Sequence, residues 1–119
     1  RLALFDAIVN NGDRKGGHIL PLADGRILGV DHGVTFSAEP KLRTVLWAWR
    51  SAPFDDAELG FVARGVAELA TDRGLRSSLA PYLSQGEIDA LDARLHQLAR
   101  LASFPEPSPD WPPLPWPLV

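Results

Sequence analysis

The chain has 119 residues, a formal net charge of −3 and a pI near 5.5. This acidic balance argues against a nucleic-acid-binding protein, because such domains usually carry a basic face. No apolar run approaches the roughly 20 residues that span a bilayer, and the absence of Cys excludes disulfides and thiolate metal sites. We therefore expect one cytoplasmic globular domain. Since the chain begins with Arg1 and not Met, we do not expect this to be the natural translation start.

The first ten residues are predicted to form the end of a helix. Their apolar members share one helical face, at Leu2, Phe5, Ile8 and Val9. The Asn10-Asn11-Gly12 sequence then ends the helix, because Asn and Gly tolerate the left-handed conformation of a C-cap. Residues 12–17 are accordingly predicted to be a polar loop.

Two short β-like runs follow, His18–Leu22 and Arg26–Val30. Asp24 and Gly25 lie between them, and Asp-Gly is a strong signal for a tight hairpin turn. Pro21 suits an edge position, where no ladder N–H group is missed. We expect an antiparallel hairpin that ends at Asp31, and an irregular segment over 34–40.

The following part of the chain is predicted to be mainly helical. Residues 42–49 are predicted to be a short helix or an extended core segment, with Trp47 and Trp49 assigned to packing. A helix is predicted over 55–71, and an acidic variant of the capping box, with Asp55 and Glu58, marks its start.

A last helix is predicted from Ser84, which forms a capping box with Glu87, to about Phe104. Its buried face is predicted to consist of Ile88, Leu91, Leu95, Leu98 and Leu101. His96 is predicted to lie at the surface or its boundary.

From Pro105 onward the composition changes. Seven of the residues from Pro105 to Val119 are Pro, and Trp111 and Trp116 are among the others. This composition predicts an extended polyproline II tail. The tail either packs its Trp side chains onto the domain or binds a proline-recognising partner. We therefore divide the chain into a domain over 1–104 and a tail over 105–119.

Chemistry-bearing residues gather at the outer end of the predicted hairpin. Strands joined by a tight turn bring their outer ends together, so the loop and the hairpin end should share one edge. The residues expected there are Asp13, Lys15, His18 and Asp31. Glycines at 16, 17 and 33 would allow close approach by a ligand.

This set of side chains suits phosphoryl transfer. The chemistry needs a carboxylate near the attacking hydroxyl, a cation near the moving phosphoryl group, and ligands for Mg²⁺. Asp13 can supply the first and Lys15 the second, while Asp31 and His18 can hold the metal.

The same residues carry a family resemblance. Asp13-Arg14-Lys15-Gly16-Gly17-His18 has the register of the protein-kinase catalytic loop, and Asp31-His32-Gly33 has that of the kinase Asp-Phe-Gly motif. The wider wording, "LFDAIVNNGDRKGGHILPL" and then "GVDHGVTF", resembles the actinobacterial phosphatidylinositol 3-/4-kinase-like proteins, which are atypical kinases. The resemblance covers Arg1 to about Trp49, and beyond that it is mainly a run of C-lobe-like helices.

The resemblance implies an α+β fold, namely a mostly helical kinase-like C-lobe whose hairpin carries the catalytic and metal-binding loops, with the N-lobe absent. Asp13 would be the catalytic Asp, Lys15 the loop Lys and Asp31 the metal-binding Asp, with ATP and Mg²⁺ as cofactors. His18 stands where most kinases have Asn, and imidazole suits Mg²⁺ less well than oxygen does.

The implied function is the C-terminal part of a phosphotransferase that moves the ATP γ-phosphate to a hydroxyl of a lipid, protein or small molecule. The Gly-rich loop, the strand Lys and the helix Glu of a kinase cannot be placed in this chain. We therefore expect a partial domain that is inactive alone and needs a missing N-lobe or upstream segment.

Three other interpretations stay open at this stage. A pseudokinase or binding module would keep the fold and act through protein contacts. A metal hydrolase would use Asp13, His18, Asp31 and His32. In a purely structural interpretation, Asp13 only caps the loop and Asp31 only ends a strand.

Overall fold

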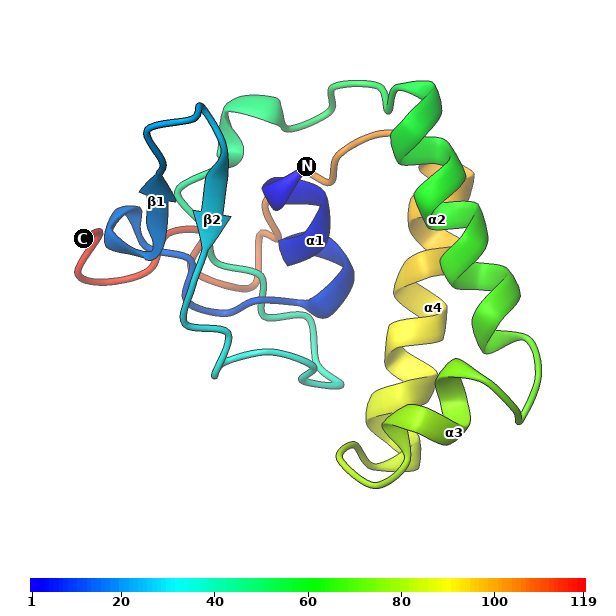
Figure 1. The fold of residues 1–119 in the computed structure, drawn as a ribbon. Coiled ribbons are helices and arrows are strands. Elements are labelled where there is room, and N and C mark those ends of the chain that lie inside the picture. The colour runs from blue at the N-terminus through cyan, green and yellow to red at the C-terminus, as the bar shows by residue number, and fades with distance from the viewer.

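The computed structural model describes residues 1–119 and shows an α+β architecture. Four α-helices accompany one two-stranded antiparallel sheet. Figure 1 shows α2, α3 and α4 on one side, the hairpin and the tail on the other, and α1 between them. None of the helices combines the length and apolar character that crossing a bilayer requires.

The helical side is built from α2 (Asp56–Leu69) and α4 (Gln85–Leu101), which run antiparallel and are joined through α3 (Leu75–Leu79) (Figure 1). Helix α1 (Leu2–Val9) packs against α4. The buried apolar side chains of these helices form one core, which comprises Leu4, Ala7, Ile8, Val9, Val62, Leu69, Ile88, Leu91, Leu95 and Leu98, together with Phe54 and Phe104.

Local signals place the helix ends. Asp55 accepts a hydrogen bond from the Glu58 amide at 2.7 Å, and the Glu58 carboxylate accepts one from the Asp55 amide at 3.0 Å. Ser84 and Glu87 make the same reciprocal pair. These capping boxes confirm the predicted starts of α2 and α4. Asn10 ends α1 with φ 56°, as expected for a left-handed C-cap.

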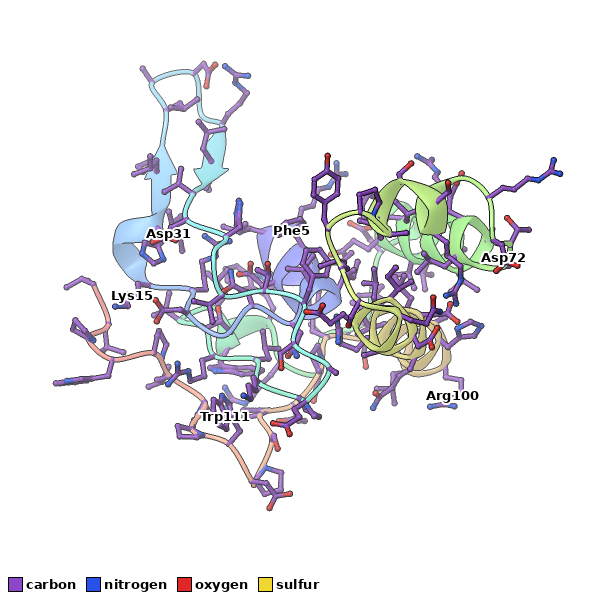
Figure 2. All side chains as sticks on the ribbon, turned by 90° about the horizontal axis from the view of Figure 1, so that it is seen from below. Phe5, Lys15, Asp31, Asp72, Arg100 and Trp111 are labelled. Atoms are coloured by element: carbon purple, nitrogen blue, oxygen red, sulfur yellow. The ribbon has the colours of Figure 1, made fainter.

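The predicted hairpin is present but short. Strand β1 (Ile19–Pro21) pairs with β2 (Ile27–Gly29), with Leu20 opposite Leu28. Gly25 in the turn has φ 85°, which a side chain would strain. The hairpin projects away from the helices (Figure 2), so most of its apolar side chains are exposed.

The segment at 42–49 takes mainly the extended form of its two predicted alternatives. Only Trp47–Trp49 forms a short 3-10 turn. Before it the chain pairs with the polar loop, because the amides of Arg43 and Val45 donate to the carbonyls of Asn11 and Arg14. Tertiary pairing thus selects the extended form, whereas Trp49 is half exposed instead of packed in the core.

The end of α4 also differs. The helix ends at Leu101, three residues before the predicted end, because Ala102 adopts a left-handed conformation with φ 51°. The chain turns there and sets Phe104 edge-on against Phe54, with ring centroids 5.0 Å apart. Leu101 is exposed and not part of the buried face. His96 is exposed, as predicted.

Arg94 of α4 fixes the end of α1, where the polar loop begins. Its Nε donates to the Ile8 carbonyl at 2.9 Å, and its Nη1 donates to the Ser37 carbonyl at 3.1 Å. Burial lowers the pKa of Arg94 to about 10, so its charge is retained at neutral pH. The helical core thereby holds the base of the loop in place.

Candidate functional site

Two asparagines shape the start of the loop. The Asn10 amide group donates to the carbonyls of Ser37 and Glu39, so it ties the loop base to the segment after the hairpin. Asn11 donates to the Asp6 carboxylate at 3.1 Å and accepts from the Asp13 amide at 2.9 Å. The backbone of Asp13 is therefore fixed by side chains.

Arg14 connects the loop to both of its neighbours. Its guanidinium is fully buried, and it binds the Asp6 carboxylate through Nε at 2.9 Å and Nη2 at 2.8 Å. Its Nη1 donates to the Val30 carbonyl at 2.8 Å. Gly29 allows β2 to approach α1 closely beside it, because a Cβ at Gly29 would lie 2.6 Å from Leu2 Cδ1. Arg14 thus joins α1, the loop and the end of β2.

The structure brings together the four residues predicted to share one edge. Lys15 Nζ lies 3.8 Å from Asp13 Oδ2, and His18 Nε2 lies 3.3 Å from Asp31 Oδ2. His18 Nδ1 lies 3.0 Å from the Asp13 carbonyl oxygen, so the imidazole links the two carboxylate-bearing segments. Figure 2 shows Lys15 and Asp31 beside each other, near the base of the hairpin.

The His18 imidazole makes contacts through both ring nitrogens. Nδ1 lies 3.0 Å from the Asp13 carbonyl oxygen and accepts from the Lys15 amide at 3.4 Å. Nε2 lies 3.3 Å from Asp31 Oδ2. An imidazole nitrogen and a carboxylate oxygen at this distance can share a proton or a bound cation.

Asp31 has an unusual backbone for a non-glycine residue. Its φ is 59°, and its side chain is 62% exposed. Such conformations are uncommon and gather at functional sites. The next residue, His32, turns toward α1 and packs edge-on against Phe5, with centroids 5.1 Å apart. Asp31 and His32 thus face different surroundings.

The candidate site is an open surface. None of the four cavities of the molecule is lined by Asp13, Lys15, His18 or Asp31. The most voluminous one, about 650 Å³, lies between α1, the hairpin and Trp49. No group of three or more His, Asp or Glu side chains in residues 1–119 is placed to hold a metal ion. His32, one of the four residues of the metal-hydrolase interpretation, packs against Phe5 and belongs to no such group.

Sequence reasoning missed the buried network beneath the loop, which is made by Asp6, Asn11 and Arg14. Asp6 is a charged residue, and it is fully buried among the apolar residues of α1. That placement was the available signal, because a carboxylate within the apolar part of a helix needs a buried partner. The first cation after the helix is Arg14, eight residues beyond Asp6.

Comparison with known proteins adds one relative. Protein Rv2133c of Mycobacterium tuberculosis (strain ATCC 25618 / H37Rv) is 46% identical to the chain over 117 residues. The match covers 98% of the chain and 41% of the relative, so the chain spans less than half of that protein's length. No family model matches the chain, and no solved structure matches it.

Proposed function

We propose that this chain is the C-terminal part of an atypical kinase of the phosphatidylinositol 3-/4-kinase-like kind, with a kinase-like C-lobe. The observation that carries the proposal is the meeting of Asp13, Lys15 and Asp31 around His18, in the chain order of a catalytic loop and an Asp-x-Gly motif. Because ATP and Mg²⁺ are available in the cytoplasm, the proposal also places the protein there.

In this proposal the site has two ends with different roles. Asp13 and Lys15 act on the reacting groups at one end, and Asp31 and His18 hold the metal at the other. Asp13 accepts the proton of the attacking hydroxyl, and the Lys15 ammonium, 3.8 Å away, balances negative charge near the moving phosphoryl group. The buried Arg14–Asp6 pair keeps Asp13 and Lys15 in position from below.

Asp31 and His18 would hold Mg²⁺, which when bound neutralises charge on the phosphate oxygens. Mg²⁺ usually takes only one or two carboxylates from the protein and completes its shell with phosphates and water. The one exposed carboxylate, Asp31, matches this ligand set, whereas the His18 imidazole is a weaker ligand for Mg²⁺ than an oxygen would be. In this proposal, the parts that would hold the nucleotide belong to the longer protein of which this chain is a part.

The test uses the full-length protein and labelled ATP. We expect Mg²⁺-dependent ATP binding in a thermal-shift assay and transfer of the γ-phosphate to a hydroxyl acceptor. Asp13→Asn should abolish transfer and keep nucleotide binding, whereas Asp31→Asn should weaken Mg²⁺-dependent binding itself. Asp24→Asn, an exposed carboxylate at the hairpin turn, is the matched control. Absence of any Mg-ATP effect on the full-length protein would overturn the proposal.

A binding module is the second candidate, and the exposed end of the tail favours it. Trp116 is 84% exposed between two prolines, so the tail presents a large apolar side chain that a partner could contact. The same thermal-shift measurement separates the two, because a binding module without nucleotide chemistry shows no response to Mg-ATP.

A further inference from the structure

The tail is anchored on the domain before it reaches the candidate site. The Trp111 ring lies 5.4 Å from Lys41 Nζ and 5.3 Å from Arg43 Cζ, in cation–π range. The Pro113 carbonyl accepts from the Thr44 amide at 3.1 Å and from Trp47 Nε1 at 2.8 Å. Pro115 is also buried, so the chain is held up to that residue.

Beyond Pro115 the tail lies on the glycines of the loop. The Gly16 amide donates to the Leu118 carbonyl at 2.7 Å. A Cβ on Gly16 would lie 3.3 Å from Val119 Cγ1, and one on Gly17 would lie 3.8 Å from the Val119 carbonyl carbon. Figure 1 shows the C-terminal end beside the loop that precedes β1.

The tail contacts Gly16, the residue next to Lys15, and the two ends of the site differ in exposure. The Lys15 and Asp13 side chains are 19% and 28% exposed, whereas that of Asp31 is 62% exposed. In the view of Figure 2, Lys15 lies between Asp31 and the tail. A general base must come within hydrogen-bond reach of the hydroxyl it activates. The end beside the tail is therefore the end where an acceptor would approach.

We propose that residues 116–119 form a movable cover over the Asp13–Lys15 end of the site, and that the cover must lift before an acceptor larger than water can reach Asp13. This inference rests on the proposed kinase function. The cover is loosely held, because the Trp116 side chain is 84% exposed and the hydrogen bond from the Gly16 amide to Leu118 is the one backbone hydrogen bond that residues 116–119 make. Segments with so few buried contacts open at low cost.

The first test measures access to Lys15 without any activity. Lys15 and Lys41 are the chain's two lysines, so acetylation of the full-length protein by acetic anhydride can be followed at each by peptide mass spectrometry. Deleting residues 116–119 should raise the Lys15 rate relative to Lys41 about fivefold, the effect of losing one backbone hydrogen bond of typical strength.

A second variant removes the same hydrogen bond by changing its donor in the loop. Gly16→Pro removes the donor to Leu118 at the first position of a 3-10 turn, where Pro is tolerated, and Lys15 has the extended backbone that precedes Pro. It should raise the Lys15 rate as well. Trp116→Ala is the control and should not, because that side chain is already exposed. An unchanged rate in both test variants overturns the cover.

The second test measures transfer from Mg-ATP to phosphatidylinositol vesicles, to a serine peptide and to water. Deletion of 116–119 should raise transfer to whichever acceptor is used severalfold more than it raises hydrolysis. If Lys15 is uncovered but transfer rises no more than hydrolysis, the gating role is wrong. If Lys15 is uncovered and no form hydrolyses or transfers phosphate, the proposed kinase function fails while the cover stands.

Discussion

Arg14 and Asp6 form a fully buried bidentate ion pair directly beneath the candidate catalytic loop. The pair joins a helix residue to a loop residue, and the same guanidinium donates to Val30, the residue before Asp31. The Arg14 guanidinium therefore sets the spacing between the loop at 13–18 and the Asp31-His32-Gly33 motif. It binds Asp6 and the Val30 carbonyl at 2.8–2.9 Å.

Asp6→Asn should strongly destabilise the protein. It leaves the buried Arg14 charge without its counter-charge, and breaking a buried pair from one side costs about 3–5 kcal/mol. Urea unfolding followed by circular dichroism measures the change. Asp24→Asn is the control, because its pair with Arg26 is mostly exposed and should be worth less than about 1 kcal/mol. Equal losses in the two variants would contradict the assigned importance of the buried pair.

His18→Asn should change the metal preference of the full-length protein. Imidazole suits borderline transition metals, whereas an amide oxygen suits Mg²⁺. Under the proposed kinase function, the activity with Ni²⁺ relative to Mg²⁺ should therefore fall in the variant. Phosphate transfer at matched metal concentrations measures the ratio, with the exposed His96→Asn as the control. A ratio that stays constant would show that His18 does not touch the metal.

Two glycines of α2 make a matched pair for stability. Gly60 has open space where a Cβ would go, so Gly60→Ala should stabilise the protein by about 0.5–1 kcal/mol through helix propensity. At Gly65 a Cβ would lie 2.9 Å from Leu95 Cδ2 in the core between α2 and α4. Gly65→Ala should instead destabilise by about 1–3 kcal/mol from overpacking. Thermal unfolding of both variants checks the opposite signs.

The capping box of α4 should make stability depend on acidic pH. Hydrogen bonds from the Ser84 amide and hydroxyl lower the pKa of Glu87 below 4.5. A carboxyl group with a lowered folded-state pKa stabilises the protein above its unfolded value and loses this effect as pH falls through the folded value. In Glu87→Gln, the stability deficit measured at pH 7 should therefore shrink below pH 4.5. A deficit of the same size at pH 3 and pH 7 would contradict the linkage.

Short-range chemistry in the sequence determined the helix caps and the hairpin. Asp55, Ser84 and Asn10 act on their own neighbours within a few residues, so their effects could be read without the fold. The hairpin turn at Gly25 follows the same rule, and hairpin closure predicted the meeting of Asp13, Lys15, His18 and Asp31.

The tertiary structure alone decided which segments pack against that site, namely the buried Asp6–Arg14 pair and the C-terminal tail. The amides of residues 43 and 45 pair with the polar loop across about 30 residues, and this pairing decided between the helix and the extended segment predicted for 42–49. The Asp6–Arg14 pair and the contact of Leu118 with Gly16 also join segments whose approach depends on the packing of the whole chain. Such contacts cannot be predicted from the spacing of residues in the sequence, because they form only when the core has brought the segments together.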